Sequence, residues 1–211
     1  MPTLLFQGDS ITDASRNRQD PHHLGTGYVY LASSTLRYRY AEQDIRIFNR
    51  GISGNRTCDL LSRWEPDCLD LQPDFLSLYI GVNNTWRRFD RQDPTPADVF
   101  AAELEKLLIS ALELPSLTPE RTVLLEPFFL SAPIGDAAEW EADLTPKREI
   151  VQELAERYNT HFIPLQSIFN DACARAPAAY WAPDGVHPSP AGHMLIAQAW
   201  LLEMEDLLAA F

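Results

Sequence analysis

Short apolar runs alternate along this chain with longer segments in which apolar residues recur every three or four positions. The short runs predict five strands: Thr3 to Gln7, Ile45 to Asn49, Phe75 to Ile80, Thr122 to Glu126 and His161 to Leu165. The longer segments predict helices, two of which carry apolar stripes: Phe100, Leu104, Leu107, Leu108 and Ala111, and then Ala197, Trp200, Leu201, Met204 and Leu208. Strands that alternate with helices predict an α/β fold, with a parallel sheet covered on both faces.

Two dipeptides predict where helices begin. Thr145-Pro146 and Ser189-Pro190 each combine a preferred N-cap residue with a proline at the first helical position. The stretch from Pro127 to Leu144 then reads as a long excursion between elements. A length of 211 residues without a linker or repeat suits one domain, so we expect a single domain over residues 1–211.

Polar, glycine-bearing loops follow three of the predicted strands, and a fourth precedes the last helix. They are Gly8-Asp9-Ser10, Gly51 to Asn55, Gly81 to Asn84 and Asp184 to His187. In parallel sheets of this kind, ligands bind at the carboxyl ends of the strands. Four such loops on one rim indicate a functional site more strongly than any one of them alone.

These loops contain the parts of a nucleophilic triad. Ser10 lies where a strand turns into a helix, which exposes its hydroxyl, and Asp184 precedes His187 by one tight turn. A serine nucleophile needs a nearby base, and that base needs a third group to fix its tautomer. Taken singly, each loop also has a purely structural interpretation. Asp9 or Ser10 could merely cap a helix, and the Asp184 turn could be an ordinary surface turn.

Acyl transfer also needs hydrogen-bond donors for the developing oxyanion. The backbone N–H groups of Ser10 and Gly54 are candidates, since a glycine lets the chain approach a substrate closely. The side-chain amide of Asn83 could add a third donor. Alternatively, Gly54 only completes a turn and Asn83 only stabilises its loop. These segments alone do not distinguish the structural role from the oxyanion role.

The net charge and the cysteine content limit the classes of ligand and the compartment that we expect. A formal net charge of −13 disfavours nucleic acid and anionic membranes and is easier to reconcile with a neutral substrate. Three cysteines without CxxC spacing, and four further histidines without acidic partners at ligand spacing, predict neither a disulfide framework nor a metal site. Strand residues begin at Thr3, which leaves no room for a signal peptide, and no apolar run spans a bilayer. We therefore expect a cytoplasmic protein.

The four loops together resemble the blocks of the SGNH, or GDSL, hydrolase family. GDS at 8–10, the glycine of ISGN at 52–55, GVN at 81–83 and DGVHP at 184–188 occur in the order of those blocks. The resemblance covers essentially the whole chain. It implies a three-layer α/β/α sandwich of the flavodoxin-like type around a central parallel five-stranded sheet, without metal or organic cofactor. It also implies Ser10 as nucleophile, Asp184 and His187 as its partners, and Ser10, Gly54 and Asn83 as the oxyanion hole.

Further segments are similar to those of bacterial GDSL acetylxylan esterases: GDSITD, LGTGY at 24–28, NRGISGN, RW at 63–64, GVNNTWRR and HPSPAGHM. This resemblance implies deacetylation of xylan-derived oligosaccharides, within the cell, by a homo-oligomer. One residue departs from the pattern, because the family usually has Asp where this chain has Asn84. From the sequence alone, we expect restoring that Asp to retain or raise activity.

Five residues beside the motif loops suit a sugar: Tyr28, Trp86, Arg87, Arg88 and Trp181. Flat aromatic rings can cover the apolar face of a pyranose and arginines can donate to its hydroxyls, although aromatic residues more often belong to the core. Two other functions stay open. One is a thioesterase or lysophospholipase with the same loops, and the other is a carbohydrate-binding protein that has lost catalysis.

Overall fold

The computed structural model describes residues 1–208, and side-chain environments through Met204. Its centre is a sheet of five strands, all parallel, in the order β2-β1-β3-β4-β5. The strands are β1 (Thr3–Gly8), β2 (Arg46–Asn49), β3 (Phe75–Tyr79), β4 (Thr122–Leu125) and β5 (His161–Ile163). All five predicted strands are therefore confirmed, with boundaries that differ by one or two residues.

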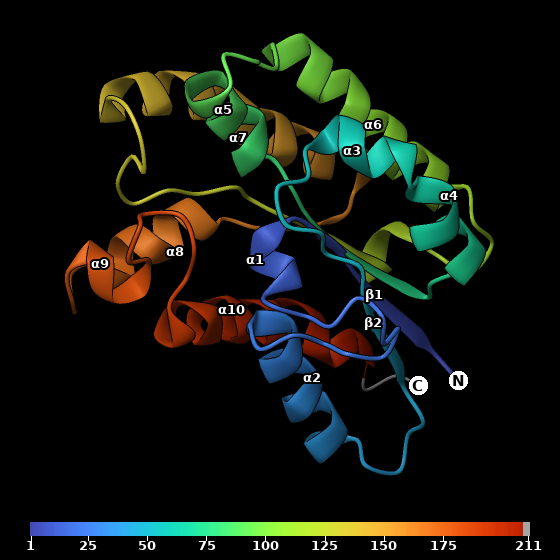
Figure 1. Cartoon of the computed structure of the whole chain (residues 1–211). Coiled ribbons are helices and arrows are strands. Elements are labelled where there is room, and N and C mark those ends of the chain that lie inside the picture. The colour runs from blue at the N-terminus through green and yellow to red at the C-terminus, as the bar shows by residue number, and fades with distance from the viewer. Residues whose placement is uncertain (209–211) are drawn as a thin grey trace.

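Helices cover both faces of this sheet, which confirms the three-layer α/β/α class (Figure 1). The helices are α1 (Ser10–Asp13), α2 (Tyr28–Arg39), α3 (Thr57–Ser62), α4 (Trp64–Asp67), α5 (Val82–Asp90), α6 (Ala97–Leu112), α7 (Ala137–Tyr158), α8 (Leu165–Ala172), α9 (Ala178–Trp181) and α10 (Pro190–Leu208). Short 3-10 turns, η1 (Leu69–Leu71) and η2 (Pro119–Arg121), precede β3 and β4. Figure 1 shows α2 and α10 on one side of the sheet and α3, α4 and α6 on the other.

Successive side chains of a central strand pack into two different hydrophobic cores, one on each face of the sheet. In β1, Leu4 and Phe6 pack into the cluster under α2 and α10, whereas Leu5 packs into the cluster under α4 and α6. The alternation follows from the pleat, which points successive side chains to opposite faces of a sheet. Because both faces are buried, the strands read as continuous apolar runs in the sequence.

Most residues of the two predicted helical stripes point into these cores. All five residues of the first stripe are buried, and so are Ala197, Trp200 and Met204 of the second, whereas Leu201 is partly exposed. Leu208 of that stripe has a side chain outside the described part, and residues 209–211 of the expected domain also lie outside it.

Of the two predicted helix starts, one is correct. Helix α10 begins at Pro190, and the Ser189 hydroxyl accepts a hydrogen bond from the Gly192 N–H at 3.2 Å. The start at Thr145-Pro146 is wrong, because α7 begins nine residues earlier than Pro146, at Ala137, and is capped by Asp136. Burial of Trp140 and Leu144 holds this N-terminal half in the helix despite the internal proline.

Candidate active site

The turn after β1 gives Asp9 and Ser10 different contacts. Asp9 is the N-cap of α1, where its Oδ1 accepts the Ile11 N–H at 3.0 Å. The Ser10 hydroxyl takes no part in that cap and lies 2.8 Å from Nε2 of His187. The cap of this turn therefore belongs to Asp9, and the Ser10 hydroxyl is left in contact with His187.

The turn from Asp184 to His187 places a carboxylate against Nδ1 of the His187 imidazole. Oδ2 of Asp184 lies 2.7 Å from Nδ1 of His187, while its Oδ1 accepts the N–H groups of Val186 at 2.9 Å and His187 at 2.7 Å. Burial opposes ionisation of Asp184, but these hydrogen bonds outweigh it and lower its pKa. A carboxylate at Nδ1 places the ring proton there, so the lone pair of Nε2 faces the Ser10 hydroxyl.

The candidate donors for an oxyanion lie beside Ser10. Gly54 and Asn83 line one small cavity together with Ser10 and His187. Gly54 has a φ of +84°, a conformation that side chains disfavour, and among residues 1–208 neither its N–H nor that of Ser10 donates to a protein acceptor. The Asn83 amide is oriented by two bonds: Nδ2 donates to the Asn55 carbonyl at 3.1 Å, and Oδ1 accepts from Arg87 at 3.2 Å.

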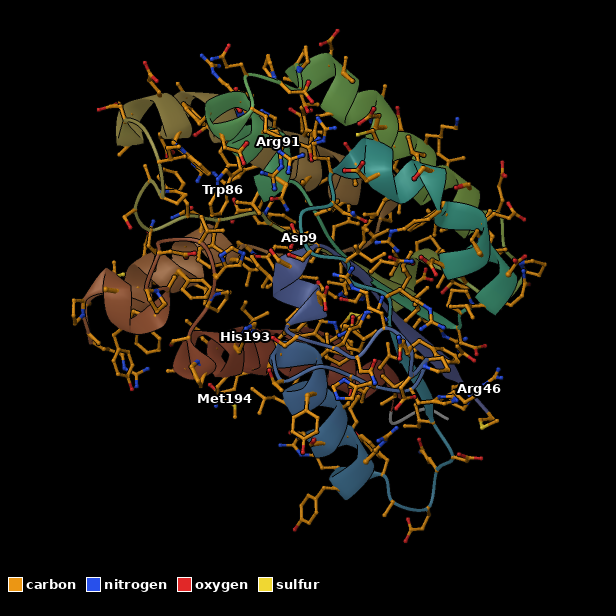
Figure 2. All side chains as sticks on the ribbon, viewed as in Figure 1. Asp9, Arg46, Trp86, Arg91, His193 and Met194 are labelled. Carbon is orange, nitrogen blue, oxygen red and sulfur yellow. The ribbon has the colours of Figure 1, made fainter. Side chains whose placement is uncertain are left out.

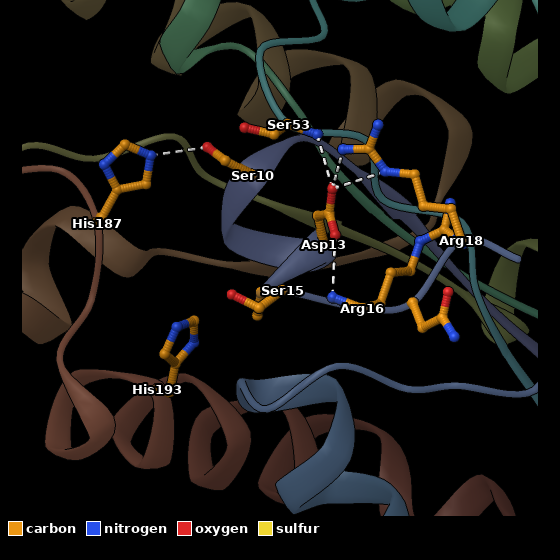
Figure 3. A pocket seen from close by; sticks show the side chains of 10 residues that line it. Ser10, Asp13, Ser15, Arg16, Arg18, Ser53, His187 and His193 are labelled. Atoms are coloured by element: carbon orange, nitrogen blue, oxygen red, sulfur yellow. Dashed lines mark hydrogen bonds and ion pairs between the residues drawn. The ribbon is translucent and has the colours of Figure 1, made fainter. Parts of the chain in front are cut away.

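The loop that contains Gly54 is tied to α1 through a buried carboxylate. Oδ2 of Asp13 accepts the Ser53 N–H at 3.0 Å and also pairs with Arg18, while Oδ1 accepts the Arg16 N–H (Figure 3). Asp13 therefore links α1, which begins at Ser10, to the loop that contains Gly54. Asp13 is not among the site residues predicted from the sequence, although it stands in the GDSITD segment.

A second buried carboxyl lies at the turn itself. Burial raises the pKa of Asp9 to about 6, although the Ile11 N–H and the nearby His187 both work against this rise. Above that pH, Asp9 is ionised, and its charge favours the protonated imidazole that forms when His187 takes a proton. Asp9 thus supplies charge to the site without touching the reacting atoms.

Two cavities meet at Ser10 and His187. The smaller measures about 160 Å³ and contains Gly54, Asn83, Trp86 and Arg87. The larger measures about 600 Å³ and contains polar residues of the turn after α1, including Arg16 and Asn17, together with Ser53 and His193 (Figure 3). Ser10 therefore stands between a narrow cavity with the candidate oxyanion donors and a wide polar one.

The structure brings two of the five sugar-binding candidates to the site. Trp86 and Arg87, both on α5, line the smaller cavity, and the Trp86 ring centroid lies 5.6 Å from that of His187. In the view of Figure 2, Trp86 lies above Asp9 and His193 lies below it.

The other three lie elsewhere, which corrects their assignment. Tyr28 is fully buried, with its hydroxyl 3.0 Å from that of Thr12, so it belongs to the core. Arg88 pairs with Asp143 at 2.9 Å and lines neither cavity. Trp181 is 6% exposed, donates to the Ala176 carbonyl and borders a separate hollow beside α10. Proximity in sequence to a motif loop did not distinguish outward-facing side chains from core ones.

Within residues 1–208, the structure shows neither a candidate metal site nor a membrane-spanning helix. No group of three or more His, Cys, Asp and Glu side chains in that range is arranged to hold a metal ion. No helix in the same range is long and apolar enough to cross a membrane.

Comparison with known proteins places the chain in a family. The model of the GDSL-like Lipase/Acylhydrolase family matches residues 6–195. An acetylxylan esterase from Geobacillus stearothermophilus is 37% identical over 205 residues, which cover 95% of this chain and 93% of that one. The chain therefore belongs to the GDSL-like lipase/acylhydrolase family and is a carboxylic ester hydrolase.

Solved structures give the same result. A protein from Parabacteroides merdae that is described as a GDSL-like lipase superposes with a TM-score of 0.91 at 39% identity, covering 97% of this chain and 95% of its own. The crystal structure of Axe2, an acetylxylan esterase from Geobacillus stearothermophilus, superposes with a TM-score of 0.86 at 35% identity, covering 96% and 94%. The resemblance thus extends over the whole fold.

Proposed function

We propose that this protein is a serine esterase that removes acetyl groups from acetylated carbohydrates, in particular xylan-derived oligosaccharides. The observation that supports it most is the continuous chain from Ser10 through His187 to Asp184, with contacts of 2.8 and 2.7 Å. These two contacts have the geometry that an alcohol nucleophile, a base and an orienting carboxylate require.

The reaction begins when His187 accepts the Ser10 proton through Nε2. The hydroxyl oxygen attacks the acetyl carbonyl, and a tetrahedral oxyanion forms. The N–H groups of Ser10 and Gly54 and the Nδ2 of Asn83 donate to that oxyanion, on the side of the smaller cavity. Asp184, and Asp9 from further away, stabilise the imidazolium at the same moment.

His187 then donates its proton to the sugar oxygen, which leaves as an alcohol, and the acetyl group stays on Ser10. Water next enters the place of the sugar and gives a proton to His187 as it attacks the acyl carbonyl. A second tetrahedral oxyanion forms and collapses to acetate, with the proton returning from His187 to Ser10. Apart from one water molecule, these steps use only side chains and backbone N–H groups of this chain.

The sizes of the two cavities support a short acyl group. The cavity of about 160 Å³ with the oxyanion donors is bounded by Trp86 and Arg87 and has room for an acetyl group. The cavity of about 600 Å³ is polar and suits the alcohol part of an oligosaccharide. A lysophospholipid or a long acyl-thioester would need an apolar channel, which neither cavity supplies.

The relatives support the same substrate class. The Geobacillus stearothermophilus protein is an acetylxylan esterase, and Axe2 structures include one described as an acetyl-xylooligosaccharide esterase. Three other Axe2 structures are catalytic mutants in which a serine, an aspartate or a histidine is replaced by alanine. These are the residue types of the triad proposed for the present chain.

A substrate comparison tests the proposal. The kcat/KM of hydrolysis should be higher for acetylated xylo-oligosaccharides, which release acetate, than for an acetyl-thioester or for a lysophospholipid, which releases a fatty acid, since only the first fills the polar cavity. A coupled acetate assay and a fatty-acid assay give the three values. A preference for the thioester or the lysophospholipid would overturn the substrate assignment while leaving the serine chemistry intact.

Asn83 provides a prediction about the oxyanion. Replacing Asn83 by Ala should lower kcat by about 10²–10³ with little change in KM, because the bond from Nδ2 strengthens only in the transition state. Steady-state kinetics on the sugar acetate measure both constants. A rise in KM with unchanged kcat would instead make Asn83 a ground-state contact.

Asn84 is the matched control, and its contacts change the expectation drawn from the sequence. The Thr57 hydroxyl donates to Glu103 at 2.5 Å, so its oxygen can only accept from Nδ2 of Asn84, at 2.9 Å. Asn84 is fully buried, and an Asp there would set two acceptors against each other beside Glu103. Asn84→Asp should therefore lower the Tm by several degrees and reduce kcat far less than Asn83→Ala does. Equal losses of kcat would refute the oxyanion assignment.

We further propose that the protein acts in the cytoplasm as a homo-oligomer. Cys58, Cys68 and Cys173 are all free thiols, as suits a reducing compartment. Large apolar side chains stand exposed on the neighbouring helices α2 and α10, among them Tyr38 and Leu202. Light scattering coupled to size exclusion measures the mass, and a monomer would remove the oligomer from the proposal.

A further inference from the structure

His193 lines the larger cavity together with the nucleophile and the base. It lies in the first turn of α10, six residues after His187, and its ring projects from the helix toward the space between Ser15 and His187 (Figure 3). The neighbouring Met194 is 42% exposed and lines a different hollow. His193 takes no part in the proton transfers proposed for Ser10, His187 and Asp184.

One hydrogen bond determines where the His193 ring has its proton. The Tyr28 N–H donates to Nδ1 of His193 at 3.2 Å, so Nδ1 must keep a lone pair. The proton of the neutral ring is then on Nε2. Within the described residues, Nε2 has no protein partner, so this N–H is an unused donor on a cavity-lining ring.

The ring stays neutral while the enzyme works. Burial, and secondly the charge of a protonated His187, lower the pKa of His193 to about 4. Protonation of Nδ1 would also break the bond from Tyr28. His193 is thus a neutral donor with no free lone pair, which suits a hydroxyl or ether oxygen and does not suit a second base.

The ring is held in place by close packing. A Cβ on Gly27 would lie 2.7 Å from Cε1 of His193 and 2.6 Å from Cβ of Ala14, so the absence of a side chain there lets the ring approach the backbone. Gly27 belongs to the LGTGY segment, which therefore seats this ring, whereas its Tyr28 ring is buried in the core. A donor fixed in this way loses little entropy when it binds a ligand.

We propose that the Nε2–H of His193 donates to a hydroxyl or ring oxygen of the sugar next to the scissile acetyl ester, and so determines the preference for carbohydrate esters over simple acetates. This inference rests on the proposed function, since it assigns the wide polar cavity to the sugar. The oxyanion donors occupy the other cavity, which leaves the sugar on the His193 side.

Two variants separate the donor from the structural bond. In His193→Asn, the side-chain oxygen can replace Nδ1 as acceptor for Tyr28, but the amide is too short to reach the position of Nε2. In His193→Gln, the amide nitrogen reaches that position. We expect Asn to lower the ratio of kcat/KM for an acetylated xylo-oligosaccharide to kcat/KM for 4-nitrophenyl acetate about 3- to 10-fold, mainly through KM. Gln should recover part of the ratio, and Met194→Ala should leave it unchanged.

A parallel fall for both esters in His193→Asn, or an unchanged ratio, would overturn the inference. Binding gives a readout independent of turnover: in Ser10→Ala protein, calorimetry should show weaker binding of the acetylated xylo-oligosaccharide once His193 is also Asn. Equal affinities would again reject the role. If the wild type released no acetate from any ester, the proposed function would fail by itself, while the binding comparison would still decide about His193.

Discussion

Replacing Ser10 by alanine should abolish ester hydrolysis, with a loss in kcat of about 10⁶. The reason is that no other hydroxyl is within reach of Nε2 of His187 in the described structure, where the Ser10 Oγ lies at 2.8 Å. The fold should be unaffected, because the hydroxyl makes no other hydrogen bond and its removal leaves only a small space. Hydrolysis of 4-nitrophenyl acetate measures the activity, and the Tm measures the fold.

The same experiment distinguishes an esterase from a carbohydrate-binding protein without catalysis. Wild-type turnover that disappears in Ser10→Ala requires the serine, whereas equal rates in both proteins would remove Ser10 from the mechanism. A fluorophosphonate should label the wild type on Ser10 and leave the variant unlabelled. Ser53→Ala is a useful control, since Ser53 lines both cavities but its known bond uses the backbone N–H.

The sheet and the rim could be predicted because they depend on local patterns. Each strand is a short apolar run closed by polar residues, as Thr3 to Gln7 shows, and the carboxyl ends of parallel strands must share one edge. Residues at those ends, such as Ser10 and Asn83, therefore converge whatever the details of packing. The wrong start of α7 at Pro146 shows the limit of such patterns, since tertiary burial of Trp140 outweighed a local signal.

The substrate-facing side chains could not be predicted from the sequence, because their direction depends on contacts between distant segments. Tyr28 and Trp181 stand beside motif segments as Trp86 does, yet of these three only Trp86 lines the cavity at Ser10. The same holds for His193, whose free N–H follows from a bond to a residue 165 positions away. The one available signal was its position in HPSPAGHM, close behind His187, and it did not reveal a direction.

The departure from the family pattern at Asn84 can be interpreted only from the residues that contact its side chain. The sequence shows an amide in place of a carboxylate, which suggests a lost charge beside Asn83, the candidate oxyanion donor. The structure shows that Thr57 gives its proton to Glu103, so a donor is required at position 84. The substitution therefore matches a local hydrogen-bond direction and leaves Asn83 oriented by other partners.

The second large effect is expected at Asp184. Asp184→Asn keeps an oxygen for the N–H groups of Val186 and His187, so the turn should hold and the Tm should change little. At the position of Oδ2, however, the new amide donates to Nδ1 of His187, and the ring proton moves to Nε2. His187 then faces Ser10 with a donor where a base is needed, and kcat should fall by about 10⁴.

The companion variants make this effect interpretable. His187→Ala should lose nearly as much activity as Ser10→Ala, since the alcohol then has no base. Asp184→Ala removes the turn's hydrogen bonds as well, so it should lower the Tm where Asp184→Asn does not. If Asp184→Asn retained kcat within about tenfold, Asp184 would only shape the turn, because the wrong-tautomer penalty of a true triad is far larger than that.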